Sequence, residues 1–542
     1  MRLWQLPLAF VLLLYTRLVY PIDMDGRLPA ARKGLLVISN HVHDLEGLYL
    51  PPYLALHGKK PVRPLASSRL FEPGFLKGRS PRWLRPLIPG VNIGPILKAL
   101  GVLPIENMPR LLYRRGLSAE AVRRIIEGQL EDARDALQRG HLLYLTPEGR
   151  MTRDGSLGRL KRALRELALP DTPILLCGIS PDPFSPGPLR LVLRLVPPAL
   201  PEDLETSLLA ARPLTASHLL AAAWEAFGFP SGPDPRELLR RALALKEEVS
   251  PLALWDRSMA EDPERALWTS LSHLRSHHPA FPDVEHMGRY LARGFRETQE
   301  ALSRVEKVQR ERIRKVSFVI PAHNEDGLVQ KALQSVLLQE GDMPLEAVVV
   351  ENGSRDGTAE AVEAWAREHP SLPVKFLRAP RTGRSLAKNL GAREATGDLL
   401  IFLDADSQAS PSLTQEVLRL ARQGWPAASI PVTASEGTFQ EQLFFRLVDI
   451  GQRHMGVRAQ MFFCRRDLFL RLKGFREDYQ LGEDRDFLQR LEREGYPVAY
   501  LQGASIDTSP RRFRRWPLGL GPLFTLIRWG LAHIGIGRRW TY

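Results

Sequence analysis

The amino-acid sequence predicts an α/β protein in which two α/β domains are joined by a helical linker. Apolar, strand-like runs alternate with helical periodicity in residues 23–205, and the alternation restarts at Val316. The residues between these blocks have helical patterns and few strand candidates. A chain of 542 residues is also too long for one ordinary core. We therefore expect five parts, which are residues 1–22, 23–205, 206–315, 316–516 and 517–542.

Residues 1–22 are predicted to be a hydrophobic membrane anchor. Leu3–Tyr15 are mostly apolar, and Arg17 interrupts this run before the length of about 20 residues that a bilayer-spanning helix needs. A short anchor in the membrane interface fits this length, and it predicts a location at the cytoplasmic face of a membrane. The rival interpretation is a cleaved signal peptide, because Arg2 precedes the apolar run.

The composition indicates a folded protein with anionic partners. Hydrophobic residues make up 44% of the chain, charged residues 25%, and the formal net charge is +14. Neither zinc-finger spacing nor an RNA-recognition signature accompanies this charge. We therefore expect an anionic membrane surface and phosphate-bearing substrates as partners, and no nucleic acid. The two cysteines, Cys177 and Cys464, lie in apolar runs, which favours buried packing residues over a disulfide.

A histidine follows the first predicted strand of residues 23–205. The apolar run Leu35–Ser39 leads into Asn40 and His41, and α/β folds place their chemistry at the carboxyl ends of such strands. Asp44 or Glu46 could support His41 as a base. Asp44 is three residues away, a spacing that shares a helix face, and Glu46 is five away. If His41 lies in the turn before the helix, this spacing rule does not apply, so the choice stays open.

A second polar stretch follows a later strand of the same block. The other predicted strands and the helix between them are Leu142–Thr146, Ile174–Ile179, Leu189–Val196 and Ala119–Arg139. The stretch Thr146-Pro-Glu-Gly-Arg150 could bind a phosphate through its Gly149-Arg150 turn. A histidine helped by a carboxylate can take the proton from a hydroxyl that attacks a thioester.

As a pair, Asn40-His41 and Pro147-Glu-Gly-Arg150 resemble the motifs of the glycerolipid acyltransferases of the lysophosphatidate acyltransferase type, over roughly residues 20–200. The resemblance implies acyl transfer from acyl-CoA or acyl carrier protein to a hydroxyl. It implies that His41 is the base and that Glu46, which occupies the family's acid position, supports it. It also places Glu148, Gly149 and Arg150 in the substrate site.

Residues 206–315 are predicted to be a helical linker region. They contain few strand candidates, and Met287–Arg314 is a long, highly charged helical pattern. Such a pattern suits a linker or a helix that lies on a surface.

Three polar stretches follow apolar strands in residues 316–516. They are the loop within Phe318–Glu325, the stretch Glu351–Thr358 after Leu345–Val350, and Asp404-Ala-Asp406 after Leu399–Leu403. Polar groups at neighbouring strand ends form a crevice that suits a nucleotide. Two carboxylates at a strand end can bind a hard divalent cation, and that cation could neutralise a diphosphate leaving group.

Together with Arg381–Gly391 and Gly482-Glu-Asp484, these stretches resemble family 2 of the inverting glycosyltransferases, which has the GT-A nucleotide-diphospho-sugar transferase fold, over Val316–Trp516. The resemblance implies a nucleotide-diphospho-sugar donor and an Mg²⁺ or Mn²⁺ cofactor held by Asp404 and Asp406. It makes Asp484 the base that deprotonates the acceptor, and inversion needs no covalent intermediate. The implied substrate-site residues are Pro321, Glu325, Glu351, Asn352, Arg384 and Glu483.

Residues 517–542 are predicted to be an amphipathic tail. Tryptophan and arginine on this apolar segment suit a membrane interface, and a helix that packs on the preceding domain is the alternative. The whole chain therefore predicts a bifunctional membrane-associated transferase that makes a glycolipid or an acylated saccharide, with a membrane lipid as acceptor. The alternative is a glycosyltransferase whose N-terminal half is a non-catalytic membrane-docking or scaffold module.

Overall fold

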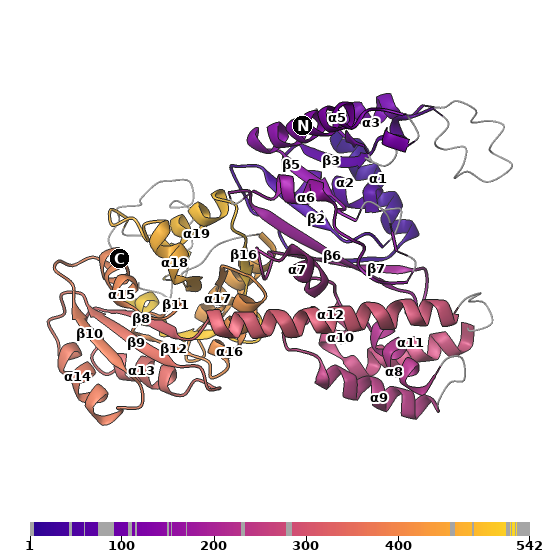
Figure 1. Cartoon of the computed structure of the whole chain (residues 1–542). Helices are drawn as coiled ribbons and strands as arrows, with labels where there is room; N and C mark the ends of the chain where they lie inside the picture. The colour runs from indigo at the N-terminus through magenta and orange to yellow at the C-terminus, as the bar shows by residue number, and fades with distance from the viewer. Residues whose placement is uncertain are drawn as a thin grey trace. The chain divides into compact units, whose positions relative to one another are not determined.

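The computed structural model describes residues 5–42, 46–58, 60–73, 92–106, 111–113, 116–148, 151–152, 154–169, 171–228, 234–277, 284–455, 461–479, 482–515, 521, 523–525 and 527. The chain divides into two compact units, Met1–Val305 and Glu306–Tyr542. Each unit contains a sheet of seven strands with helices, so the predicted α/β class is confirmed for both (Figure 1).

The sheet of the first unit is mostly parallel. Its strand order is β1-β7-β6-β2-β5-β3-β4, and only the β6–β7 pair is antiparallel among the described strands. All five residues of β2 are buried, which is why its sequence is a continuous apolar run rather than an alternating one. The strands are β1 (Ile22–Asp25), β2 (Leu35–Ser39), β3 (Val62–Ser67), β4 (Leu103–Ile105), β5 (Leu142–Leu145), β6 (Ile174–Asp182) and β7 (Arg190–Val196).

Two groups of helices belong to the first unit. The first group is α1 (Gln5–Val19), α2 (Glu46–Gly58), α3 (Gly94–Leu100), α5 (Ala119–Gln138) and α6 (Arg162–Leu167), with the 3-10 turn η1 (Ser68–Phe71). The second is α7 (Leu204–Ala210), α8 (Ala216–Phe227), α9 (Pro235–Glu248), α10 (Arg257–Glu261), α11 (Pro263–His277) and α12 (Val284–Arg312). In the second group α8, α9 and α11 pack on one another, and α7 and α8 pack on β6 (Figure 1). The division between the two units falls inside α12.

Helix α1 packs on α2 with one face and exposes apolar side chains on another. Ala9, Leu13 and Thr16 are buried, four residues or three apart, as one face of a helix requires. The exposed side chains include Phe10, Val11, Leu14, Tyr15 and Leu18. Among the described residues, no helix has the length and apolar character needed to cross a membrane.

The second unit has a mixed sheet and a small three-stranded sheet. Its large sheet has the order β10-β9-β8-β11-β15-β13-β16, parallel from β10 to β11, and the small sheet has the order β12-β17-β14. The large-sheet strands are β8 (Val316–Ala322), β9 (Leu345–Glu351), β10 (Val374–Arg378), β11 (Leu399–Phe402), β13 (Ala427–Ser429), β15 (Phe462–Arg465) and β16 (Val498–Tyr500). The small-sheet strands are β12 (Ser407–Ala409), β14 (Val432–Thr433) and β17 (Ile506–Thr508).

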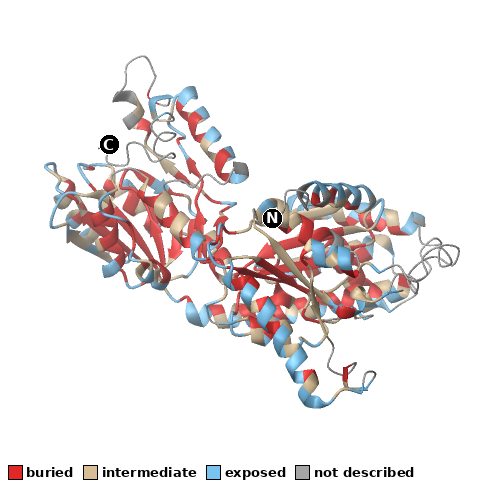
Figure 2. Cartoon of the chain, turned by 90° about the horizontal axis from the view of Figure 1, so that it is seen from above, coloured by how far each residue is buried: buried red, intermediate tan, exposed pale blue. Residues whose placement is uncertain are grey.

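Buried strands run through the core of the second unit (Figure 2). A cluster of phenylalanines also belongs to this core. Phe402 packs against Phe462, Phe469 and Phe475 with ring centroids 5.0 to 5.1 Å apart. The helices are α13 (Val329–Leu337), α14 (Thr358–Glu368), α15 (Arg384–Glu394), α16 (Leu413–Arg422), α17 (Phe439–Met455), α18 (Arg466–Arg471) and α19 (Glu483–Arg493), with the 3-10 turn η5 (Pro510–Arg515). Cys177 and Cys464 are both buried and free, as predicted.

Candidate active sites

The side chain of Asn40 connects the end of β2 to β6 through two hydrogen bonds. Its amide nitrogen donates to the Ile179 carbonyl at 2.8 Å, and its amide oxygen accepts from the Ile179 N–H at 2.7 Å. Asn40 is fully buried, so these two bonds are not in competition with water. The next residue, His41, is therefore held at a defined place at the carboxyl end of the sheet.

Glu46 is the acid that the structure brings to His41. Glu46 opens α2, and its Oε2 lies 3.0 Å from His41 Nδ1, while its Oε1 accepts from the Val42 N–H at 2.5 Å. A carboxylate at Nδ1 favours the tautomer with a proton there, which leaves Nε2 as the basic nitrogen. The His41 side chain keeps about a fifth of its surface exposed. Asp44, the other acid considered, lies outside the described residues.

Glu148 joins the two predicted motifs of the first unit. Its Oε1 accepts from the His41 N–H and its Oε2 from the Gly158 N–H, both at 2.7 Å. Burial raises the pKa of Glu148, and the two backbone N–H groups counteract this shift. Glu148 therefore holds the backbone of His41. Its predicted part in substrate binding stays a prediction, and Gly149 and Arg150 lie outside the described residues.

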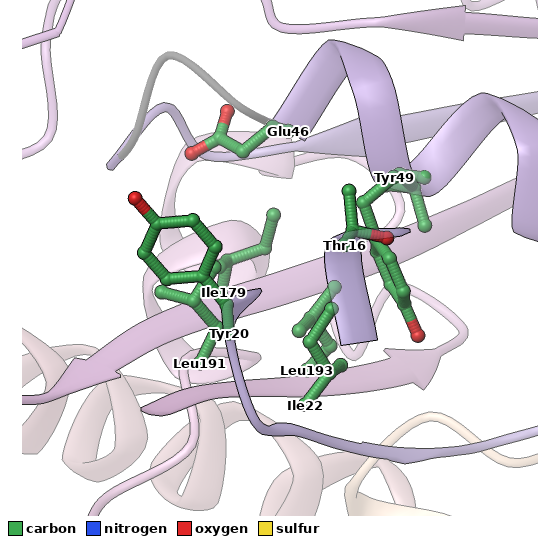
Figure 3. A pocket seen from close by; sticks show the side chains of 9 residues that line it. Thr16, Tyr20, Ile22, Glu46, Tyr49, Ile179, Leu191 and Leu193 are labelled. Atoms are coloured by element: carbon green, nitrogen blue, oxygen red, sulfur yellow. The ribbon is translucent and has the colours of Figure 1, made fainter. Parts of the chain in front are cut away.

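An apolar pocket reaches Glu46 from the side of α1 (Figure 3). It lies between α1, α2 and the strands β1, β6 and β7. The Glu46 carboxylate and the Tyr20 hydroxyl lie on one side of this pocket, and aliphatic side chains line much of the rest. The lining residues are Thr16, Tyr20, Ile22, Glu46, Tyr49, Leu50, Ile179, Leu191 and Leu193. The pocket thus places apolar side chains beside the carboxylate of Glu46.

In the second unit, Arg384 links the Asp-x-Asp motif to the Glu-Asp motif. One terminal nitrogen of Arg384 lies 2.7 and 2.6 Å from the two carboxylate oxygens of Asp404, and its Nε lies 3.5 Å from Glu483 Oε1. Arg384 is the first residue of α15, Asp404 follows β11, and Glu483 opens α19. Residues that are far apart in sequence thus meet at one end of the large sheet.

Lys388 lies between the two acids that open α19. Its Nζ is 2.7 Å from Asp484 Oδ1 and 3.1 Å from Glu483 Oε1, and all three side chains are buried. Burial and the neighbouring Glu483 raise the pKa of Asp484 to about 8, against the pull of Lys388. For Glu483, burial opposes ionisation, but Lys388 and Arg384 still hold its pKa below the ordinary value. The charge of this pair therefore resides mainly on Glu483.

A second arginine links the first polar loop to the Asp-x-Asp motif. Arg511, in η5, donates to Glu325 and lies 3.8 Å from Asp406 Oδ2. Glu325 and Asp406 are both at most a tenth exposed. The predicted nucleotide-site acid and the predicted second metal ligand are therefore neighbours of one guanidinium.

The polar residues at the end of β9 accept hydrogen bonds from the backbone of nearby loops. Asn352 accepts from the Gly383 N–H at 2.7 Å, directly before α15, and Glu351 accepts from the Ser354 N–H. Pro321 lies in β8, at the position paired with Val350. These contacts place Pro321, Glu351 and Asn352 at adjoining strand ends, where a nucleotide was expected.

The residues available for a divalent cation are two carboxylates. Within the part of the chain that the structure describes, no group of three or more His, Cys, Asp or Glu side chains has a metal-binding arrangement. Asp404 already faces a cation, the guanidinium of Arg384, through both of its oxygens. Two carboxylates completed by phosphate oxygens are a usual Mg²⁺ environment, so the donor set fits a cation that arrives with a diphosphate.

Comparison with known families identifies the region of the chain that contains most of this second site. Residues 317–467 match the model of the family "Glycosyl transferase family 2". The matched segment contains β8, β9, β11 and α15, and hence the first polar loop, Arg384, Lys388 and the Asp-x-Asp motif. The C-terminal region is a family 2 glycosyltransferase domain.

Curated relatives resemble the glycosyltransferase domain over part of their length. An undecaprenyl-phosphate 4-deoxy-4-formamido-L-arabinose transferase of Yersinia enterocolitica is 34% identical over 119 residues, which are 21% of this chain and 36% of that protein. The enzyme of the same name from Pseudomonas aeruginosa is 31% identical over 153 residues, 28% of this chain and 45% of that protein. An uncharacterized glycosyltransferase of Bacillus subtilis, YfnE, is 34% identical over 105 residues, which are 19% of this chain and 26% of that protein. The chain thus spans less than half the length of these relatives.

Solved structures of other glycosyltransferases show only a weak likeness. The mannosyltransferase PcManGT of Pyrobaculum calidifontis, in complex with GDP-Man and Mn²⁺, aligns over 40% of this chain and 64% of that one, with 23% identity and a TM-score of 0.29. S. aureus TarS in complex with UDP-GlcNAc aligns over 36% of this chain and 59% of that one, with 20% identity and a TM-score of 0.31. TM-scores this low support no argument about the function of this chain.

Two basic residues of the glycosyltransferase domain were not predicted as site residues. Lys388 lies one helical turn after Arg384, a spacing that puts both on one face of α15 and that the sequence already displays. Arg511 belongs to the arginine-rich stretch Arg511–Arg515, in which the sequence does not distinguish one arginine from another. Arg511 links the predicted site residues Glu325 and Asp406. Lys388 links Glu483 and Asp484, and Arg384 links Glu483 to Asp404.

Proposed function

We propose that the C-terminal unit transfers a sugar, with inversion, from a nucleotide-diphospho-sugar to an acceptor hydroxyl. The observation that carries this proposal is the chain of contacts among the motif acids, in which Arg384 joins Asp404 to Glu483 and Lys388 joins Glu483 to Asp484. Because of these contacts, the predicted base and the predicted diphosphate end of the site belong to one charged cluster. The family match of residues 317–467 supports the same reaction.

In this proposal the predicted site residues have separate tasks. Asp484 takes the proton from the acceptor, and Pro321, Glu325, Glu351 and Asn352 line the nucleotide site. Asp404 and Asp406 hold Mg²⁺ or Mn²⁺ with the donor's diphosphate, and such a cation neutralises the charge of the leaving group. A single displacement at the sugar requires one carboxylate base and no covalent intermediate.

The acceptor is proposed to be a membrane lipid. Two relatives of the glycosyltransferase domain are named as undecaprenyl-phosphate sugar transferases. The +14 charge of the chain suits an anionic membrane surface.

The test is an assay of nucleotide release from UDP- and GDP-sugars with Mn²⁺ and a membrane lipid extract. We expect Asp404→Ala and Asp484→Asn each to lower the rate by at least about 100-fold, the size expected for a metal ligand or general base. Asp342→Asn, an exposed acid before β9, is the matched control and should retain the rate. A near-wild-type rate in either site variant would remove that residue from the mechanism.

We propose acyl transfer as a second function, located in the first unit. The contact between His41 and Glu46 favours it, because it supplies a histidine base oriented by a carboxylate at a strand end. In this proposal the acyl donor is acyl-CoA or acyl carrier protein. The rival is a non-catalytic docking or scaffold module, in which the same pair is only structural.

Labelled acyl-CoA and membrane lipid extract separate these two possibilities. We expect His41→Ala to lower acyl transfer by about 10²–10⁴-fold and Glu46→Gln to lower it by a smaller factor, because Glu46 acts through His41. His57→Ala, at the exposed end of α2, is the control for mutation of a histidine in the same region. If the wild-type chain transfers no acyl group, the docking-module interpretation stands.

We also propose that the protein associates with the membrane surface through the apolar face of α1. Leu14 and Leu18 are at least half exposed on this face, together with Phe10, Val11 and Tyr15. Cosedimentation of the full chain with phosphatidylglycerol vesicles tests this. The double variant Leu14→Glu/Leu18→Glu should bind less, whereas Leu169→Glu, an exposed leucine outside α1, should bind like the wild type. Equal binding of all three would move the contact elsewhere.

A further inference from the structure

A buried lysine of the glycosyltransferase domain belongs to this charged cluster, but the reaction proposed above assigns no task to it. Lys388 lies on α15, and its side chain is among the most completely buried large side chains of the described residues. A buried ammonium costs several kcal/mol unless anionic partners surround it. Lys388 has them: Asp484 Oδ1 at 2.7 Å and Glu483 Oε1 at 3.1 Å, with the Phe475 ring centroid 5.2 Å from its Nζ.

The partners of Lys388 distinguish this lysine from an ordinary structural ion pair. Asp484 is the proposed base, and Glu483 also lies 3.5 Å from the Nε of Arg384, which in turn contacts both oxygens of Asp404. The contacts therefore run without a break from the proposed base to the proposed metal ligand. Three carboxyl groups share two fixed cations in this cluster, so Lys388 and Arg384 balance two ionised carboxylates, and the third carboxyl, that of Asp484, has a raised pKa.

We propose that Lys388 is a positioning residue for sugar transfer, which holds the Asp484 carboxylate at the acceptor side and ties it, through Glu483 and Arg384, to Asp404 at the donor side. This inference rests on the proposed function. Lys388 does not touch the substrate. It orients Asp484 through a charge-assisted hydrogen bond and stabilises the ionised carboxylate that must accept the proton.

The charges around Asp484 set the direction of the effect. Lys388 and Arg384 on α15 favour the ionised form of Asp484, whereas burial and Glu483 on α19 oppose it. Removing the charge of Lys388 leaves Arg384 as the remaining cation that acts on Asp484 in this group. The pKa of Asp484 then rises further, so a smaller fraction of the enzyme has an ionised base at neutral pH.

The experiment compares Lys388→Met, Lys388→Gln and Lys388→Arg in the full chain, with Lys331→Met, an exposed lysine of α13, as control. Nucleotide release with Mn²⁺ and a lipid extract gives kcat and the KM of the donor across pH. We expect Lys388→Met and Lys388→Gln to lower kcat by roughly tenfold or more, to change the donor KM by less than about threefold and to move the acid limb of the kcat profile to higher pH. Lys388→Arg should recover most of kcat and the original limb.

The outcomes distinguish this inference from the function on which it rests. If the wild type releases no nucleotide from any donor, the proposed function fails and the role of Lys388 fails with it. If the wild type is active and both neutral variants keep the wild-type kcat and pH profile, only the inference about Lys388 is overturned. Loss of activity in Lys388→Arg as large as in Lys388→Met also overturns it, because charge would then not be the property required. The circular dichroism spectrum and the melting temperature of each variant show whether a loss of activity comes from misfolding. If Lys388→Met does not fold, the comparison rests on Lys388→Gln.

Discussion

At the scale of single residues, both sites use side chains whose charge is controlled by burial. Asp484 is buried beside Glu483, and the two acids share the ammonium of Lys388. Glu148 in the first unit is buried too, but backbone N–H groups meet both of its oxygens. Burial favours the neutral form of each acid and so raises its pKa, whereas the nearby hydrogen-bond donors and cations lower the pKa again. In the Glu483–Asp484 pair, Glu483 keeps its charge, and the pKa of Asp484 is raised to about 8.

The raised pKa of Asp484 predicts how stability depends on pH. The folded chain keeps a proton on Asp484 up to about pH 8, whereas the unfolded chain releases it near its ordinary pKa of 3.8. Over this window the folded state binds more protons, so this residue makes stability fall as pH rises. The side chain at position 484 cannot ionise in Asp484→Asn. The melting temperature of this variant minus that of the wild type should therefore increase from about pH 5 to about pH 8.

Calorimetry of the full chain at several pH values checks this expectation, with Asp342→Asn as the exposed control. A melting difference between Asp484→Asn and wild type that is constant across pH would show that the carboxyl does not titrate in this window. The expected gain in stability with loss of activity is the usual trade-off at a functional residue.

At the scale of elements, helix α12 holds the loop that follows Glu148. Gly155, at φ +80°, places its α-carbon so close to α12 that an added Cβ would lie 2.0 Å from the Tyr290 carbonyl oxygen. Glu297 accepts from the Leu157 N–H at 2.9 Å, and Arg212 donates to the Gly155 carbonyl at 3.2 Å. Asp154 adds an ion pair with Arg293 at 2.7 Å. Part of the predicted linker thus supports the loop beside the His41 site.

Gly155→Ala should therefore destabilise the first unit. The positive φ costs about 1–2 kcal/mol for any residue with a Cβ, and the clash with the α12 backbone adds to this because a backbone carbonyl cannot turn away. Gly187→Ala has a similar φ, +92°, but open space around its Cβ, so it should show only the first cost. Urea unfolding of both variants measures the difference, and equal losses would mean that α12 yields at this contact.

At the scale of the whole molecule, each unit has its own sheet, its own core and its own candidate site. The family match lies entirely in the second unit, and the His41–Glu46 pair lies entirely in the first. The proposed acyl and sugar transfers use different donors, and each site consists of residues from its own unit.

We therefore expect the two activities to be separable by mutation. His41→Ala should leave nucleotide release within about twofold of wild type, and Asp484→Asn should do the same for acyl transfer, because the two sites share no residue and independent sites usually behave additively. Parallel assays of both variants on one lipid extract check this. A variant that loses both activities while its melting is unchanged would show that the sites are coupled.

The amino-acid sequence alone predicts the two α/β blocks, the strands that end at each site and the acids that follow them. These are local features, because strand periodicity and polar strand ends depend on neighbouring residues. Leu35–Ser39, Leu345–Glu351 and Leu399–Phe402 all form strands where they were expected. The sequence also indicated the family of the C-terminal block, because the family's motifs are short stretches of consecutive residues, as the match over residues 317–467 bears out.

Which side chains are in contact depends on the tertiary structure. Helical spacing left Asp44 and Glu46 as alternatives, and the contact with Glu46 depends on where α2 begins after the turn at His41. Lys388 reaches acids 95 and 96 residues away, and Arg511 reaches Glu325 across 186 residues. Such contacts follow from how helices and loops pack on the sheet, and periodicity along the chain carries no information about that packing. The pKa of Asp484 therefore depends on contacts between side chains of α15 and α19 that the sequence does not reveal.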